Sequence, residues 1–125
     1  MITKKREDKF MELFLSGRYR ALIVRLTGEL DDRAAAKIRE SVDRELIRTG
    51  AVNVAFDMSG VTFMDSAGLG VIMGRAKITE SLGGSVIVYG ARDNVQRLLT
   101  MSGLGGIVTI ADTLEEGMGE VSVRV

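Results

Sequence analysis

The N-terminal part of the chain alternates between apolar-rich runs and a short polar break. Residues 10–15 and 21–26 are rich in apolar side chains, and residues 16–18 (Ser-Gly-Arg) separate them. Two strand-like runs on either side of a turn predict a β-hairpin. The first regular structure that the sequence predicts is therefore a pair of antiparallel strands.

Farther along, apolar residues recur at the spacing of amphipathic helices. The first helix is expected to start after Asp32, a plausible N-cap, and to end at Gly50. The longest spans residues 66–82 and carries apolar side chains on more than one face, which predicts a well-buried helix. A third begins at Asn94, and residues 113–118 can add one or two final turns.

Short strand-like segments lie between these helices. Residues 52–56 alternate between apolar and other side chains, residues 86–89 are all apolar, and residues 107–110 form a last short run. A hairpin followed by alternating helices and strands predicts an α/β fold. We expect the hairpin to lead into a mostly parallel mixed sheet of four to five strands with about four helices.

The same pattern defines the domain boundaries. Residues 10–120 are expected to form a single domain, in the usual size range for one hydrophobic core. Residues 1–9 hold a cluster of lysines and one arginine, interrupted by acidic residues, and are interpreted as a flexible charged tail. Two glycines interrupt the last helix, so residues 121–125 are interpreted as a C-terminal tail.

Composition narrows the possible functions. Seventeen basic residues balance seventeen acidic ones, so no net field attracts nucleic acid or an anionic membrane. The chain has no cysteine and no histidine, which argues against a thiolate metal site, a thiol nucleophile or a Ser-His-Asp triad. No apolar run reaches the roughly 20 residues of a membrane span. These features predict a cytoplasmic protein without catalytic activity, metal or cofactor.

The connection between residues 61 and 70 is the segment where function is expected. Loops at the carboxyl ends of parallel strands carry the sites of open α/β sheets. Ser66 is a candidate N-cap of the longest helix, and the small residues Ala67, Gly68 and Gly70 leave its hydroxyl unshielded. A serine at a helix start is also commonly a cap and nothing more, so the residues alone leave both interpretations open.

Three stretches resemble one protein family. Residues 63–75 read Phe-Met-Asp-Ser-Ala-Gly-Leu-Gly-Val-Ile-Met-Gly-Arg, which is similar to the signature of bacterial anti-sigma factor antagonists. These belong to the STAS family (sulfate transporter and anti-sigma factor antagonist domains). Residues 25–31 resemble the strand-to-helix loop of that family, and residues 95–104 resemble its third helix. The matches occur in the family's order and together span roughly residues 10–115.

The resemblance implies a phosphorylation switch. In the family, an anti-sigma factor that is itself a serine/threonine kinase phosphorylates the serine after the aspartate, which is Ser66 here. The unphosphorylated form binds the anti-sigma factor and frees the sigma factor, and a metal-dependent serine phosphatase restores that form. A second serine common in the family is replaced by Ala67. The residues implied to contact the partner are Glu29, Leu30, Asp31, Met64, Asp65, Ser66, Ala67, Gly68, Leu69 and Gly70.

Other residues near this segment have simpler expected roles. Asp65 is expected either to cap the loop or to take part in recognition. Arg75 lies nine positions after Ser66, more than two helical turns away, so we do not expect it to pair with a phosphate on that serine. The methionines at 58, 64 and 73 are interpreted mainly as core residues.

Several alternatives remain at this point. Asp57 stands at a strand end like the phosphoacceptor of a response-regulator receiver, but residues 107–112 lack the lysine that a receiver needs. The glycines at 68 and 70 begin like a dinucleotide fingerprint, but the third falls at Gly74 rather than at position 73. A STAS scaffold or nucleotide-sensing module that is never phosphorylated is a further alternative.

Overall fold

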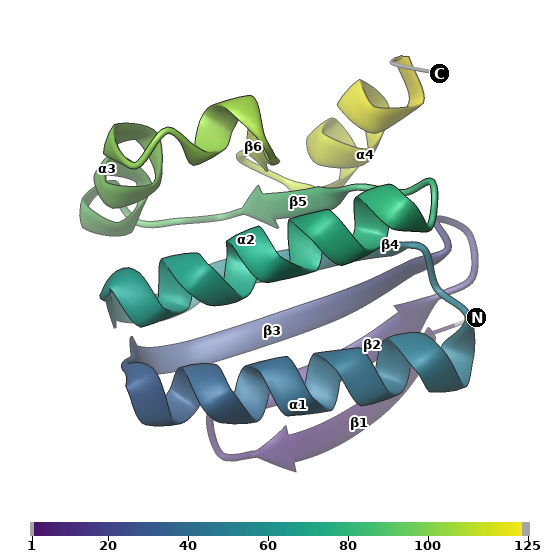
Figure 1. The fold of residues 1–125 in the computed structure, drawn as a ribbon, viewed down its shortest axis with the longest axis horizontal. Coiled ribbons are helices and arrows are strands. Elements are labelled where there is room, and N and C mark those ends of the chain that lie inside the picture. Colours follow the sequence, from purple (N-terminus) through teal and green to yellow (C-terminus); the bar gives the residue numbers. More distant parts are fainter. Residues whose placement is uncertain (1, 124–125) are drawn as a thin grey trace.

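The computed structural model describes residues 2–123 and contains strands and helices in one α/β arrangement (Figure 1). The strands are β1 (Ile2–Asp8), β2 (Met11–Ser16), β3 (Ala21–Leu30), β4 (Asn53–Met64), β5 (Val86–Tyr89) and β6 (Thr109–Ala111). The helices are α1 (Asp32–Thr49), α2 (Ser66–Ser81), α3 (Asp93–Met101), the 3₁₀ turn η1 (Leu104–Gly106) and α4 (Leu114–Val123). No helix among the described residues is long and apolar enough to cross a membrane.

The strands form one mixed sheet in the order β1-β2-β3-β4-β5-β6. The β1–β2 and β2–β3 pairs are antiparallel, and the β3–β4, β4–β5 and β5–β6 pairs are parallel. Both α1 and α2 lie side by side on one face of the sheet (Figure 1). The predicted hairpin followed by a mostly parallel sheet is confirmed, although the described chain has one strand more than expected.

The additional strand is β1, in the segment that the sequence analysis assigns to a flexible tail. Its backbone pairs with β2 from the Ile2–Ser16 pair to the Asp8–Met11 pair, with a register shift between Arg6 and Asp8. The tail interpretation is therefore corrected for residues 2–8, while residue 1 lies outside the described part of the chain. Charged residues are common on edge strands, where they oppose edge-to-edge aggregation, so a charge cluster does not by itself indicate a tail.

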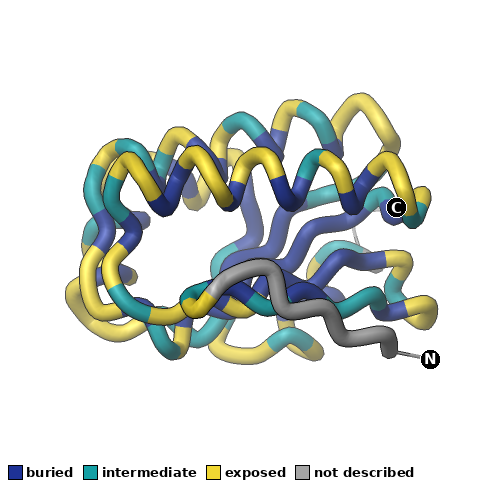
Figure 2. The backbone as a smooth tube through the Cα atoms, turned by 90° about the horizontal axis from the view of Figure 1, so that it is seen from below, coloured by how far each residue is buried: buried dark blue, intermediate teal, exposed yellow. Residues whose placement is uncertain are grey.

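Most of the core lies between the sheet and its helices. Alternate residues of the central strands, such as Val24, Phe56 and Val88, are fully buried on the side of α1, α2 and α3. Figure 2 shows the strands as a buried layer beneath helices whose outer turns are exposed. Burial of this kind removes apolar area from water at about 25 cal/mol per Å² and supplies most of the driving force for folding.

A smaller cluster forms on the opposite face of the sheet, where Ile23, Ala55 and Ile87 pack with Met118 of α4. A Cβ atom at Gly117 would lie 2.3 Å from Cγ2 of Ile87, so this glycine allows α4 to approach the sheet closely. From the sequence, the glycines at 117 and 119 are expected to interrupt the helix and end it early. The structure corrects this, because α4 continues through Val123, and only residues 124–125 of the predicted tail lie outside the described part.

Candidate functional site

The starts of α1 and α2 lie next to each other because the strands before them are neighbours. Strands β3 and β4 run parallel, and their last residues, Leu30 and Met64, are paired. The backbone N–H of Asp65 donates to the carbonyl oxygen of Leu30 over 3.5 Å. The loop around Asp31 and the segment after Met64 therefore meet at one edge of the sheet, on the left of Figure 1.

Each helix begins with an aspartate cap one residue earlier than the sequence analysis places it. Asp31, rather than Asp32, is the N-cap of α1, and its Oδ1 accepts from the N–H of Ala34 over 3.0 Å. Asp65, rather than Ser66, is the N-cap of α2, and its Oδ1 accepts from the N–H of Ala67 over 2.9 Å. Both aspartates have extended backbone conformations, as an N-cap requires.

The correction at Asp65 leaves Ser66 without a capping role. Ser66 is the first residue of α2 and is exposed. Within the described part of the chain, its hydroxyl has no hydrogen-bond partner, since the cap is supplied by Asp65. A hydroxyl group at this position is accessible to an external protein or enzyme.

The predicted contact residues divide into a surface group and a buried group. Leu30 and Met64 are 2% and 4% exposed, and Gly68 is also buried. A Cβ atom at Gly68 would lie 2.4 Å from Cγ of Met64, so this glycine makes room for the methionine beneath the helix. The exposed or half-buried members are Glu29, Asp31, Asp65, Ser66, Ala67, Leu69 and Gly70. We call this set the Ser66 surface, and the three buried residues support it from below.

The end of β4 is irregular, a feature that no sequence pattern predicts. The register between β3 and β4 shifts between Arg25 and Thr27 and again between Gly28 and Glu29, each time leaving an extra residue in β4. Gly28 has φ +87°, a conformation that favours glycine. As a result β4 continues to Met64, and the connection expected over residues 61–70 shrinks to Asp65.

One exposed apolar residue of this segment is absent from the predicted contacts. Phe63 is 49% exposed although its neighbour Met64 is buried. The sequence gives one signal for it, a bulky aromatic residue directly before the Met-Asp-Ser run, but the register shifts that turn it outward cannot be seen in the sequence.

Asp57, the residue that favoured a receiver domain, belongs to a row of polar side chains across the sheet. Paired positions place Glu12, Arg25, Asp57 and Tyr89 on neighbouring strands. The Asp57 carboxylate accepts from the N–H and hydroxyl of Ser59, over 3.1 and 2.7 Å, and from Nε of Arg25 over 3.3 Å. Asp57 is 8% exposed, and no cluster of potential metal ligands occurs among the described residues. These contacts give Asp57 a structural role.

Arg75 also has a structural place, away from Ser66. Its side chain is buried between the helices, and its Nε lies 3.0 Å from Oδ1 of Asp43 on α1. Burial lowers the pKa of Arg75, Asp43 opposes that shift, and the positive charge of Arg39 adds to it. Of the methionines, 58 and 64 are buried as expected, whereas Met73 is 37% exposed.

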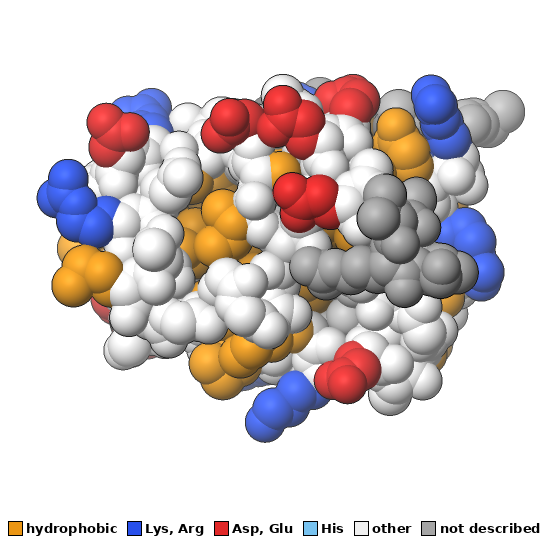
Figure 3. Space-filling view, turned by 90° about the horizontal axis from the view of Figure 1, so that it is seen from above, with side chains coloured by type: hydrophobic (Ala, Val, Ile, Leu, Met, Phe, Trp, Pro, Cys, Tyr) orange, Lys and Arg blue, Asp and Glu red, His pale blue; other side chains and the backbone are white. Residues whose placement is uncertain are grey.

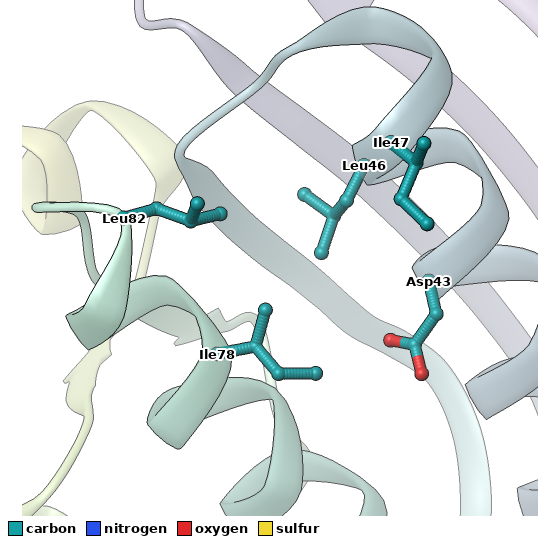
Figure 4. Close-up of a pocket in the computed structure, with 5 residues that line it drawn as sticks. All are labelled: Asp43, Leu46, Ile47, Ile78 and Leu82. Carbon is teal, nitrogen blue, oxygen red and sulfur yellow. The ribbon is translucent and has the colours of Figure 1, made fainter.

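A groove lies between the C-terminal halves of α1 and α2, at the opposite end of these helices from Ser66. It has a volume of about 350 Å³ and is lined by Leu46, Ile47, Ile78 and Leu82, with Asp43 at its edge (Figure 4). Its lining is aliphatic apart from the Asp43 carboxylate, which is paired with Arg75.

Comparison with known proteins agrees with this geometry. The model of the STAS domain family matches residues 15–117. The anti-sigma F factor antagonist of Paenibacillus polymyxa is 39% identical over 102 residues, covering 82% of this chain and 87% of that protein.

Solved structures share the fold. A crystal structure from Thermotoga maritima, described as a putative anti-sigma factor antagonist, has a TM-score of 0.76 and 29% identity, and the match covers 98% of this chain and 95% of that one. The unphosphorylated form of SpoIIAA has a TM-score of 0.71 and 24% identity, over 100% of this chain and 99% of that one. Its phosphorylated form, from Bacillus, has a TM-score of 0.64 and 23% identity, over 97% and 99%.

Proposed function

This chain belongs to the STAS domain family, and from that premise we propose that it is an anti-sigma factor antagonist switched off by phosphorylation of Ser66. Its unphosphorylated form binds an anti-sigma factor serine/threonine kinase in the cytoplasm and frees a sigma factor. A metal-dependent serine phosphatase returns the phosphorylated form to the active state. The observation that carries the proposal is the exposed Ser66 hydroxyl, free of any capping role, beside the Asp31 loop.

The unphosphorylated Ser66 surface is suited to close docking. Ser66, Ala67 and Gly70 are small, and no side chain lies within 4 Å of the position that a Cβ atom at Gly70 would take. A partner's backbone can therefore approach the first turns of α2 closely. The carboxylates of Asp31 and Asp65 are engaged as helix caps, which fixes the shape of the surface before binding.

Phosphorylation of Ser66 changes the charge of this surface without requiring a change of fold. It adds about −1.5 to −2 charges at neutral pH. The N-terminus of α2 tolerates an anion, because its first backbone N–H groups and the helix dipole favour negative charge. In the complex, however, the dianion would be buried beside the carboxylate of Asp65, which repels it. Burying unpaired charge costs several kcal/mol, and each 1.4 kcal/mol weakens binding about tenfold.

The names of the relatives support the same role. The Paenibacillus polymyxa protein is named an antagonist of an anti-sigma factor, and SpoIIAA occurs in an unphosphorylated and a phosphorylated form. This chain keeps a phosphorylatable serine at an exposed helix start, as such a switch requires.

The direct test is phosphorylation by the anti-sigma factor kinase from the same bacterium. We expect incubation with that kinase and ATP to add one phosphate at Ser66, located by mass spectrometry of peptides. Ser59 and Thr62 are also exposed and lie close in sequence, so they serve as internal controls. Phosphate on either of them, with Ser66 unmodified, would contradict the proposal.

Binding measurements test the switch itself. Isothermal titration with the kinase should give tight binding for Ser66→Ala and at least tenfold weaker binding for Ser66→Asp, with unchanged circular dichroism for both. Equal affinities would show that charge at this position does not control docking.

A further inference from the structure

Exposed apolar side chains mark places where a folded chain can gain by binding another molecule. Six large ones are exposed among the described residues. Ile47 and Leu82 line the groove at the far end of α1 and α2, and Met101 and Ile107 belong to the region of α3 and η1. Figure 3 shows the face that carries α3, where hydrophobic side chains are visible among scattered charged ones. The remaining two are Met73 on α2 and Phe63 at the end of β4.

Phe63 differs from the others by its type and by its place. It is an aromatic residue, the class that dominates binding energy in protein interfaces. Its Cα lies within about 10 Å of that of Ser66, because three residues of extended chain reach no farther. A standard interface buries about 800 Å² on each partner, equivalent to a disc of roughly 16 Å radius. An interface of that size centred on Ser66 reaches Phe63.

The irregular end of β4 holds Phe63 outward. Successive side chains of a strand point to opposite faces, so the buried position of Met64 sends Phe63 to the other side of the sheet. Phe63 is paired with Glu29 of β3, an exposed member of the Ser66 surface. The extra residue in β4 at this point is Thr62, opposite the step from Gly28 to Glu29. Bulges of this kind re-aim side chains beside functional sites.

Contacts from α3 brace this part of the strand. Nδ2 of Asn94 donates to the carbonyl oxygen of Thr62 over 3.0 Å, and Nε of Arg92 donates to the carbonyl oxygen of Ser59 over 3.3 Å. The backbone directly before Phe63 is thus tied to a helix, although the ring itself remains half exposed. A pre-positioned aromatic ring loses little conformational entropy on binding.

We infer that Phe63 is the apolar anchor of the surface that binds the anti-sigma factor, and that it enters an apolar socket on that partner. The inference rests on the proposed function and extends its binding site across the sheet edge from Ser66 to Phe63. The occupant follows from continuity, because Phe63 pairs with Glu29 and lies three residues before Ser66. Phosphorylation at Ser66 would then break a docking site whose affinity comes largely from the neighbouring ring.

The test compares four variants by isothermal titration with the anti-sigma factor kinase from the same bacterium. We expect Phe63→Ala to weaken binding at least tenfold and Phe63→Leu, which keeps apolar volume, to weaken it less. Ile47→Ala is the matched control, because Ile47 is 87% exposed but lies at the far end of α1 from Ser66. The affinity of this variant for the kinase should stay within twofold of wild type. Ser66→Asp, measured in parallel, tests the proposed function.

The outcomes separate the two proposals. If Ser66→Asp weakens binding while Phe63→Ala binds like wild type, the anchor is refuted and the switch stands. If the wild-type chain does not bind the kinase, or Ser66→Asp binds like wild type, the proposed function fails. If Phe63→Ala changes only the self-association of the free protein, seen by sedimentation velocity, Phe63 serves contact between copies and the inference is overturned. Thermal denaturation should show that Phe63→Ala is folded, because truncating a half-exposed side chain removes little from the core.

Discussion

The partly buried environment of Tyr89 changes the pKa of its phenol and so makes the stability of the fold depend on pH. Burial raises the pKa of the Tyr89 phenol to about 12, and the nearby carboxylate of Asp57 adds to the shift. The unfolded chain releases the same proton near pH 10. The neutral phenol therefore stabilises the fold fully below pH 10, and this contribution disappears as the pH rises toward 12.

We predict that Tyr89→Phe removes part of the loss of stability at high pH. Between pH 9 and pH 11.5, wild type should lose about 1–2 kcal/mol more than Tyr89→Phe, a value reduced for the partial exposure of the ring. Urea denaturation at both pH values measures the difference. Identical pH profiles for wild type and Tyr89→Phe would contradict the assignment.

Two glycines of α2 differ in the space around them, so we expect alanine substitution to have opposite effects on stability at the two positions. We expect Gly68→Ala to destabilise the fold by about 1–3 kcal/mol, because its Cβ would collide with Met64. Gly70→Ala meets nothing within 4 Å and should stabilise the helix by about 0.5–1 kcal/mol. Thermal denaturation measures both effects.

The Gly70→Ala variant also tests how closely a partner approaches the Ser66 surface. Gly70→Ala should bind the anti-sigma factor kinase more weakly than wild type although it is more stable, because the added methyl group stands where the partner approaches. If Gly70→Ala were stabilised and bound normally, close approach at this turn would be excluded.

At the scale of elements, α1 and α2 are joined by an ion pair whose two ends are unequally buried. Arg75 is 5% exposed, and its Nη1 has no hydrogen-bond partner among the described residues, whereas the Asp43 side chain is 36% exposed. Removing Asp43 leaves a buried guanidinium without its counter-charge. Removing the arginine leaves a carboxylate that water can reach.

We therefore predict that Asp43→Ala destabilises the protein by about 2–3 kcal/mol and Arg75→Leu by less than about 1 kcal/mol. The double variant should resemble Arg75→Leu alone, since no unpaired buried charge remains. Urea denaturation of the three proteins gives the comparison, and a larger loss for Arg75→Leu than for Asp43→Ala would contradict it.

For the whole molecule, the edge of the sheet decides how the N-terminal segment contributes. Strand β1 pairs only with β2, so it adds backbone hydrogen bonds at the rim of the sheet and leaves the central strands unchanged. The family match begins at residue 15, after this strand. We therefore expect the core and the Ser66 surface to form without β1.

Deletion of residues 2–8 should leave a cooperatively folding protein with a lower urea midpoint. It should bind the anti-sigma factor kinase as wild type does, because Ser66 lies at the carboxyl ends of the central strands β3 and β4, away from β1. It should also self-associate more readily, since β2 becomes an exposed edge strand. Light scattering and isothermal titration test these expectations, and loss of cooperative unfolding would show that β1 belongs to the core.

The sequence by itself determined the features that depend on local periodicity. Apolar spacing located the hairpin, α1, α2, α3 and the parallel strands, because each element must bury one face. The motif around Ser66 placed the candidate site at a strand-to-helix connection. Helix caps were missed by one residue at Asp32 and Ser66, since two neighbouring residues were both chemically able to cap.

Tertiary structure alone decided the features that depend on contacts between distant segments. The pairing of β1 with β2, the glycine at 117 against Ile87, and the register shifts beside Gly28 all arise from what lies across the sheet. Those same contacts bury Leu30 and Met64 and expose Phe63. A local pattern reports which residues can face inward, but the packing of neighbouring strands fixes which of them do.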